Sequence, residues 1–320
     1  MTRSGRALAL IGALLVALPA FAGTYALSVA TLILWFAYAG QAWNVMMGFA
    51  GQLSLGHALY VGVAGYVAGG LFVHHGVPPV VGLPVAMIAC TLGGLAIGSL
   101  AFRFGISGVY LALLTIAFAE FTRIGFDHLA WTGGPGGMFL KVGRHGAWDL
   151  LNFRGPPIMY YYAALILAAL ALALCARLSR SRVGFYWRAI REDEEAAKAL
   201  GINVFRWKLG AVALSAAMTS VAGVFSAFYY NSLFPEQVFG IHRSIEIILG
   251  PIIGGVGTLF GPILGAAALT LLSDGITESF AALGWEISGI KQVSYGVVLL
   301  RVVMFLPRGI WPALARRLRL

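Results

Sequence analysis

Long apolar runs dominate the chain, and polar residues gather in a few short stretches between them. Residues 7–102, which are 96 consecutive positions, contain no Asp, Glu, Lys or Arg. A charged side chain at mid-bilayer costs about 2.5–3.5 kcal/mol, whereas a protein surface in water is normally rich in charge. A helical span needs about 20 apolar residues, so this stretch alone is long enough for about four spans. The pattern predicts an all-α integral membrane protein.

The apolar runs predict about ten transmembrane segments in a single domain over 1–320. They lie at 7–22, 25–47, 52–73, 78–102, 106–126, 158–176, 209–231, 244–257, 259–283 and 290–306. The first run also has the pattern of a signal peptide, with Ala20-Phe21-Ala22 as a small-x-small cleavage site. We expect it to be retained, because the next run follows almost at once.

One run leaves the number of spans open. Ser244–Val256 is short, and it runs into Gly254-Gly255-Val256-Gly257 and then Gly261-Pro262. A re-entrant pair of half-helices here would reduce the count to eight. Broken helices often mark transport sites, but a glycine-packed helix contact explains the pattern equally well. The candidate pathway residues of this region are Glu246, Gly254, Gly255 and Gly257.

A second glycine-rich stretch covers residues 48–57. Its candidate pathway residues are Gly51, Gln52, Ser54 and His57. His57 has two equally good interpretations, since it can serve the pathway or donate a hydrogen bond between helices. Among the carboxylates, Glu120 is followed three residues later by Arg123, which favours an internal ion pair over a functional role.

Basic residues predict the orientation of the spans. The chain is 60% hydrophobic and 11% charged, with a net charge of +10. With ten spans, 15 Lys and Arg positions fall on one side and five on the other. The positive-inside rule therefore places both termini and the 177–208 loop in the cytoplasm, and the 127–157 loop in the periplasm. Because the positive charge lies in short loops beside apolar spans, we exclude nucleic acid as a partner.

The 177–208 loop differs from the rest of the chain. It holds four of the twelve acidic residues, all within Glu192–Glu195. Glu194 and Lys198 have the i,i+4 spacing of a helical ion pair, and Gly201 stands where a helix would end. We expect a short helix over 188–200 on which a soluble protein docks.

Specific motifs in this loop resemble a known family. Glu195-Ala196-Ala197, followed by Gly201, resembles the EAA loop of ABC importer permeases, and the string from Arg188 to Asn203 is similar to branched-chain amino-acid permeases of the LivM type. Four further stretches fit the same type in order: Asn44–His57, Ser107–Glu120, Thr132–Gly137 and Ser244–Pro262. The coupling residues implied are Arg188, Glu194, Glu195, Ala196, Ala197 and Gly201. Gly250-Pro251 departs from the pattern, because aliphatic residues are more usual there.

The resemblance implies a multi-pass subunit of the bacterial inner membrane that imports branched-chain or related hydrophobic amino acids. Its implied partners are two cytoplasmic ATPase subunits that hold ATP and Mg, a second and unlike permease subunit, and a periplasmic binding protein. The chain lacks a G-x-x-x-x-G-K-[ST] loop, so we expect no ATPase activity of its own. No Ser/His/Asp or Cys/His constellation is evident, and Cys90 and Cys175 lack metal-ligand spacing, so we also expect no catalytic residue, metal or cofactor.

Two alternatives stay open. The first concerns the substrate, because related permeases carry urea or short amides. The second alternative is a secondary transporter, which would use membrane carboxylates such as Glu246, Asp274 and Glu278. The docking-type loop at 177–208 argues against a secondary transporter.

Overall fold

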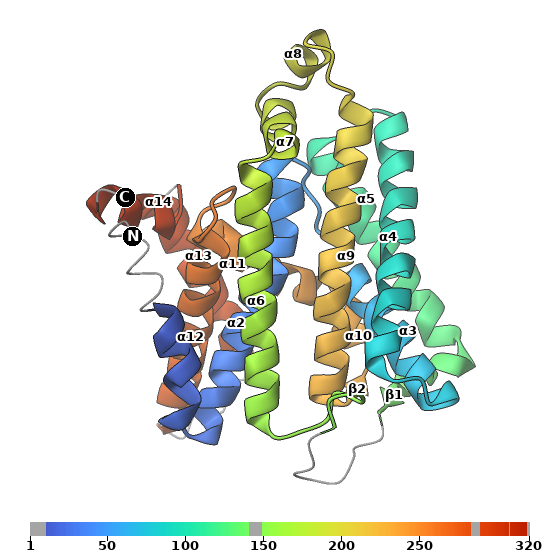
Figure 1. Ribbon diagram of the computed structural model, residues 1–320, viewed down its shortest axis with the longest axis vertical. Coiled ribbons are helices and arrows are strands. Elements are labelled where there is room, and N and C mark those ends of the chain that lie inside the picture. Colours follow the sequence, from blue (N-terminus) through green and yellow to red (C-terminus); the bar gives the residue numbers. More distant parts are fainter. Residues whose placement is uncertain (1–10, 141–148, 283–288, 307, 319–320) are drawn as a thin grey trace. The chain divides into compact units, whose positions relative to one another are not determined.

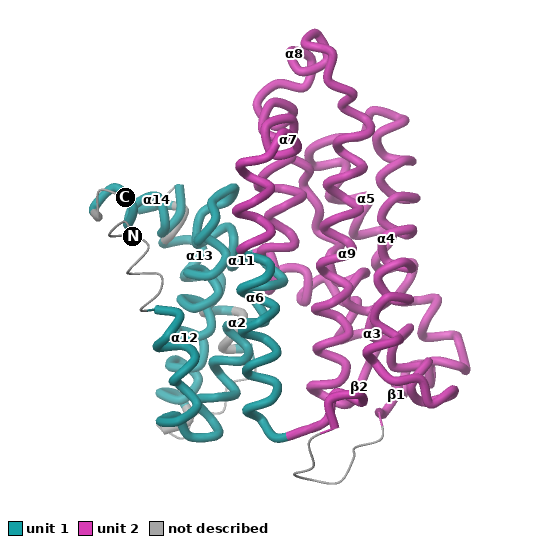
Figure 2. Tube along the Cα trace, viewed as in Figure 1, with its two compact units in different colours: residues 1–40, 156–172, 249–320 teal, residues 41–155, 173–248 magenta. Residues whose placement is uncertain are grey.

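The computed structural model describes residues 11–140, 149–282, 289–306 and 308–318. Within these residues the fold is helical, with one short two-stranded ladder. The chain forms two compact units, which Figure 2 colours separately. Unit 1 comprises residues 1–40, 156–172 and 249–320, and unit 2 comprises 41–155 and 173–248. The single domain expected over 1–320 stays a prediction.

Each predicted apolar run coincides with a helix in the part of the chain that the structure describes; residues 7–10 of the first run lie outside it. Seven of these helices are long and apolar enough to cross a membrane: Thr24–Phe49, His57–His75, Pro79–Arg103, Gly108–His128, Pro157–Ser179, Val204–Tyr230 and Gly261–Phe280. Three are shorter, namely Ile11–Ala20, α11 (Ile241–Gly254) and α13 (Ile290–Phe305). The number of spans and their orientation therefore stay predictions.

The centre of unit 2 is formed by α3 (His57–His75), α4 (Pro79–Arg103) and α9 (Val204–Tyr230), which pack against one another (Figure 1). Small residues bring these helices together. A Cβ added to Gly223 of α9 would lie 2.4 Å from the carbonyl oxygen of Val61 on α3. One added to Gly94 of α4 would lie 3.1 Å from Cβ of Ala216 on α9. Close approach of this kind replaces the hydrophobic driving force, which is absent between helices in lipid.

Shorter elements lie at the two ends of α9. The helices α7 (Arg182–Glu192) and α8 (Glu194–Ala199) precede its first residue, and β2 (Ser232–Leu233) follows its last. The strand β2 pairs antiparallel with β1 (Met138–Phe139). A helix of 27 residues is about 40 Å long, so these elements are separated by about the thickness of a membrane. The remaining helices of unit 2 include α5 (Gly108–His128) and α10 (Pro235–Phe239).

The chain between α2 (Thr24–Asn44) and α3 is broken. It continues from α2 as a π-helix, η2 (Val45–Phe49), turns at Gly51 with φ of +69°, and stays non-helical until Gly56. The prediction of a helix from residue 52 is therefore wrong in its first turn. Distant side chains satisfy this backbone instead, because Trp43 Nε1 donates to the Ser54 carbonyl (2.8 Å) and Leu55 N donates to Thr115 Oγ1 (3.1 Å).

Unit 1 contains the second break, between α11 and α12 (Gly261–Ala282). A Cβ on Gly265 would lie 1.8 Å from the Gly250 carbonyl oxygen, and one on Gly254 would lie 1.7 Å from that of Gly261. Only glycine allows these two helices to pack so closely. The helix α12 also packs against α13 and α14 (Ile310–Leu318). The helix α6 (Pro157–Ser179) belongs to both units.

Candidate coupling segment and helix breaks

The 177–208 segment folds as two helices. The predicted single helix over 188–200 is wrong, because Asp193 has extended backbone angles between α7 and α8. Its side chain accepts hydrogen bonds from the backbone N–H groups of Glu195 (2.9 Å) and Ala196 (3.0 Å). Asp is one of the best N-cap residues because it satisfies otherwise unpaired donors in this way. The break therefore begins a new helix at Glu194, directly before the EAA-like residues.

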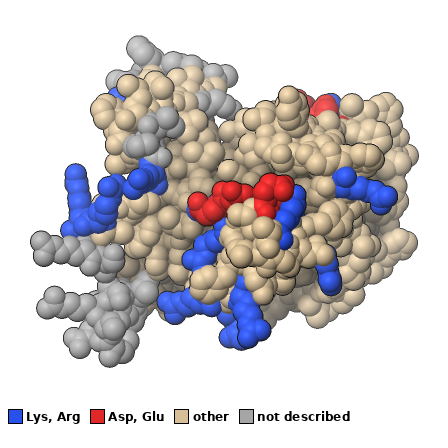
Figure 3. Space-filling model, turned by 90° about the horizontal axis from the view of Figure 1, so that it is seen from above, with Lys and Arg blue, Asp and Glu red and all other residues tan. Residues whose placement is uncertain are grey.

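The helix α8 presents its polar face outward. Lys198 Nζ lies 2.8 Å from Glu195 Oε1 and 3.5 Å from Glu194 Oε1, so the expected pair of Glu194 and Lys198 is present. The hydrogen bond to Glu195 raises the pKa of the Lys198 ammonium above its ordinary value. Glu195 and Ala196 are exposed, whereas Ala197 is buried. In Figure 3, which looks onto this end, a group of acidic side chains is bordered by Lys and Arg.

Gly201 ends α8 as expected. Its φ is +81°, a left-handed conformation that favours glycine, and its N–H donates to the Lys198 carbonyl at 2.9 Å. The next N–H, that of Ile202, donates to the Ala197 carbonyl at 3.1 Å. Open space surrounds the position where a Cβ would stand on Gly201. Backbone conformation, and not crowding, therefore requires glycine here.

Side-chain contacts hold both helices of the segment against α9. Lys208, which is buried on α9, forms an ion pair with Glu194 of α8 and lies over the Phe102 ring at 5.2 Å. The buried Trp187 of α7 donates through Nε1 to the Trp207 carbonyl at 2.8 Å. Arg188 joins α7 to the end of α6, since it donates to the Ser179 carbonyl at 2.9 Å. The segment is therefore fixed to the longest helix of unit 2.

Arg191, which joins α7 to the first break, was not among the residues that the sequence motifs selected. Its Nη1 donates to the carbonyl of Gly48 in η2. A Cβ added to Gly51 would lie 2.8 Å from Arg191 Cγ and 3.2 Å from its Cα. Arg191 lies inside the string from Arg188 to Asn203 that resembles the LivM type, but nothing in the sequence distinguished it from the other arginines of the segment.

The candidate residues of the first break gather around His57. Its Nδ1 lies 3.2 Å from Ser54 Oγ, and its Nε2 lies 2.9 Å from Ser215 Oγ on α9. Ser215 donates its hydroxyl hydrogen to the Ala42 carbonyl (2.7 Å), so it accepts from Nε2 and the imidazole carries its hydrogen there. His57 is fully buried and links elements of the bundle in this structure.

The other two candidates of the first break are held by the backbone. Gln52 donates to the Ala50 carbonyl at 2.9 Å, and the left-handed conformation of Gly51 forms the turn itself. A pathway role for Gly51, Gln52, Ser54 and His57 stays a prediction.

The second break and the preceding helix α11 contain the remaining candidates. Gly255 and Gly257 have φ of +124° and +76°, and Thr258 closes the turn by donating to the Gly255 carbonyl at 2.7 Å. The close contact at Gly254 fits a glycine-packed helix contact, and the interruption between α11 and α12 fits a broken helix, so both interpretations stay open. Glu246 accepts a hydrogen bond from Arg243 at 2.9 Å. A pathway role for these residues also stays a prediction.

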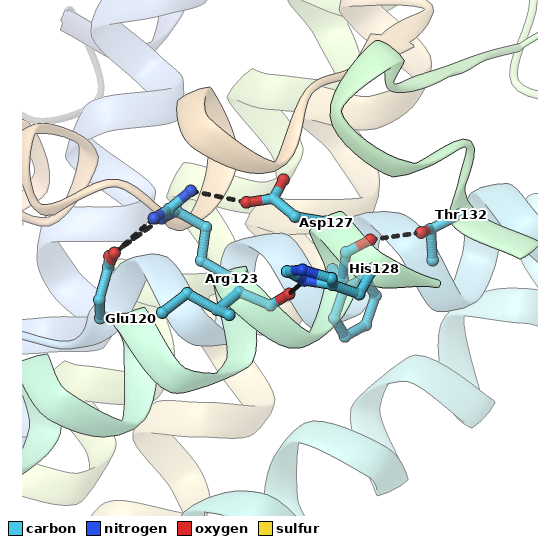
Figure 4. A network of polar contacts seen from close by, with 7 residues as sticks. Glu120, Arg123, Asp127, His128 and Thr132 are labelled. Carbon is cyan, nitrogen blue, oxygen red and sulfur yellow. Dashed lines mark hydrogen bonds and ion pairs between the residues drawn. The ribbon is translucent and has the colours of Figure 1, made fainter. Parts of the chain in front are cut away.

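An ion-pair network lies along α5 (Figure 4). Arg123 contacts Glu120 at 2.5 Å and Asp127 at 2.7 Å. The predicted pair of Glu120 and Arg123 is present, but it is not internal, because the Glu120 side chain is 49% exposed. Glu120 lies two residues beyond the midpoint of α5, or about 3 Å along its axis. A half-exposed carboxylate therefore lies close to the middle of a helix that is long enough to span a membrane.

Comparisons with known proteins agree with these motifs. The family model described as "Branched-chain amino acid transport system / permease component" matches residues 9–306. The chain belongs to this family of transport permeases.

Two of the similar proteins are named as permeases of branched-chain amino acid transport systems. LivM of Escherichia coli (strain K12), a high-affinity branched-chain amino acid transport system permease protein, is 30% identical over 96% of this chain and 75% of its own length. LivH of the same organism, a permease protein of the same description, is 31% identical over 45% of this chain and 44% of its own. The fructose import permease protein FrcC of Rhizobium meliloti is 30% identical over 39% and 36%. No solved structure matches the chain.

Proposed function

We propose that this permease is a translocation subunit of an ATP-driven importer for branched-chain or related hydrophobic amino acids. The observation that carries the proposal is α8, a capped helix that exposes Glu195 and Ala196 at the end of the bundle. Two contacts with α9 hold the surrounding segment firmly. A helix that is exposed and also rigidly attached suits the transmission of force from a docked protein.

The proposed docked proteins are two cytoplasmic ATPase subunits, which hold ATP and Mg. Leu200, directly after α8, is 80% exposed and adds an apolar contact point to the charged face. ATP binding by the docked subunits would move the 177–208 segment and switch the path from outward-open to inward-open. Such a switch needs contacts that differ between the two states. We assign the segment and both termini to the cytoplasm from the distribution of basic residues, and the protein to the bacterial inner membrane from its resemblance to importer permeases.

A second permease subunit, unlike this one, is proposed to cover α5. In lipid, a lone ionised carboxylate near mid-bilayer would cost about 2.5–3.5 kcal/mol. Glu120 is paired with Arg123, but the pair is partly exposed near the middle of α5, and an ion pair moved out of water keeps a desolvation cost. A partner subunit, or the water-filled path between two subunits, would remove this cost. A periplasmic binding protein would deliver the substrate to the opposite end of the bundle. Urea or short amides are the alternative substrates.

Affinity capture from gently solubilised membranes tests the proposal. The wild-type chain is compared with Glu195→Arg, and Arg182→Glu serves as a matched charge reversal on an exposed residue of α7. We expect ATPase subunits to co-purify with the wild type and with Arg182→Glu but not with Glu195→Arg. Size-exclusion profiles of all three would show that each is folded.

Absence of ATPase from the folded wild type would overturn the proposal in favour of a secondary transporter. The substrate class is tested separately, by uptake of labelled leucine, urea and acetamide into vesicles that contain the whole complex. Uptake of urea or acetamide but not leucine would overturn the amino-acid assignment.

A further inference from the structure

Two irregular segments of unit 2, the end of η2 and the end of α7, are in contact. The residues that form the contact, Gly48 and Arg191, are 143 positions apart in the sequence. The first is the end of η2, where the spanning helix stops and the chain turns at Gly51. The second is the last turn of α7, directly before the break at Asp193. Arg191 forms the contact, through a hydrogen bond to the Gly48 carbonyl and through packing of its backbone and the start of its side chain against Gly51.

Arg191 suits this position electrostatically. The last carbonyls of a helix have no partner in a following turn, and a positive charge near them is favourable. The guanidinium supplies both a donor and a charge to the end of η2. A second nitrogen, Nη2, lies 3.0 Å from Glu192 Oε1, so the group is held on both sides. Glycine at position 51 allows the approach, because a Cβ there would overlap Arg191.

The contact leads from the surface into the bundle. Asp193, two residues after Arg191, caps α8, while Gly51 begins the non-helical stretch that ends at His57. Three residues beyond Gly51 is Ser54, which contacts His57 and accepts the Trp43 indole N–H. Any displacement of α7 would therefore act first on Gly48 and Gly51 and then on these buried groups.

We propose that Arg191 is a positioning residue that transmits movement of the 177–208 segment to the broken stretch 51–56. This inference rests on the proposed importer function. Without the Arg191 side chain, ATPase subunits would still dock on α8 and hydrolyse ATP, but the stretch 51–56 would no longer follow them.

The experiment uses the whole complex in proteoliposomes, with Arg191→Ala, Arg191→Lys and the control Arg182→Ala on the exposed first turn of α7. ATP hydrolysis and substrate uptake are measured together. We expect Arg191→Ala to keep the ATPase subunits and basal hydrolysis but to lower uptake per ATP by at least about fivefold, the low end of measured couplings between sites. Arg191→Lys keeps the charge and a donor and should recover part of the loss. Arg182→Ala should behave as the wild type.

A chemical readout separates transmission from simple loss of structure. Ser54→Cys is introduced into each variant, and its reaction with a thiol reagent is compared with and without ATP. The native Cys90 and Cys175 are both buried, and their reaction is subtracted with the parent chain. We expect nucleotide to change the reaction rate at position 54, and Arg191→Ala to abolish that change.

Two results would overturn the inference. Wild-type uptake per ATP in Arg191→Ala would show that Arg191 transmits nothing. A parallel fall in hydrolysis and uptake, with an unchanged response at position 54, would show that Arg191 is only structural. Absence of ATPase subunits from the wild type is a different outcome, because it refutes the importer function itself.

Discussion

The partly buried ion pair between Glu194 and Lys208 gives a quantitative test of how α8 is held. Lys208 has a side chain that is only 6% exposed, and Glu194 is 36% exposed. Removing one partner of a fully buried pair costs about 3–5 kcal/mol, because the other charge is left without compensation. The partial exposure of Glu194 and the flexible stem of Lys208 let water reach the remaining charge. We therefore expect Glu194→Gln to destabilise the docked position of α8 by about 2 kcal/mol.

Replacing both partners should restore stability. In Glu194→Gln with Lys208→Met, no buried charge remains, and a buried pair replaced by uncharged groups is often neutral or stabilising. The methionine also keeps contact with the Phe102 ring, which lies 5.2 Å from Lys208 Nζ in the native chain. We expect the double variant to lie within about 1 kcal/mol of the wild type.

A double-mutant cycle measures this coupling. Unfolding in detergent gives the free energies of the four proteins, and capture of ATPase subunits gives the functional consequence. A loss of about 2 kcal/mol corresponds to about a 30-fold change in the ratio of docked to undocked α8, so Glu194→Gln should weaken capture and the double variant should recover it. Additivity of the two single variants within about 0.5 kcal/mol would refute the reasoning.

Three further predictions concern backbone and loop positions. Gly201→Pro should leave the protein folded but uncouple uptake from ATP hydrolysis, because proline cannot adopt φ of +81°. Gly201→Asn should retain coupling, because asparagine tolerates this conformation, and coupled uptake by the proline variant would contradict the prediction. Gly265→Ala should lower the melting temperature, because its Cβ would meet the Gly250 carbonyl. Gly275→Ala is the control, because open space surrounds that position, and equal melting temperatures of the two variants would contradict the prediction. Residues 149–154 form a turn in which hydrogen bonds from Asn152 lower the pKa of Asp149. The ionised carboxylate therefore stabilises this turn above the ordinary carboxyl pKa, and the stabilisation is lost as the pH falls through and below that value. Hydrogen exchange at the Asn152 amide should show protection that falls as the pH drops through and below the ordinary carboxyl pKa, and Asp149→Asn should remove that dependence.

The sequence by itself determined the class of protein and its local signals. Each apolar run contains a helix in the part of the chain that the structure describes, because burial in lipid demands apolar side chains and paired backbone groups over a whole span. The end of α8 at Gly201 and its ion pair with Lys198 were also predictable, since both depend on residues within one turn.

Only the tertiary structure decided the breaks and the contacts between distant residues. Residues 52–56 lie at the start of a predicted apolar run, but they are not helical, because Trp43 and Thr115 satisfy their backbone from elsewhere. The same holds for Arg191, whose hydrogen bond reaches Gly48. The exposure of Glu120 likewise depends on which face of α5 packs inward. Such features follow from which helices become neighbours, and that choice depends on the summed packing of many residues, which no short stretch of sequence encodes.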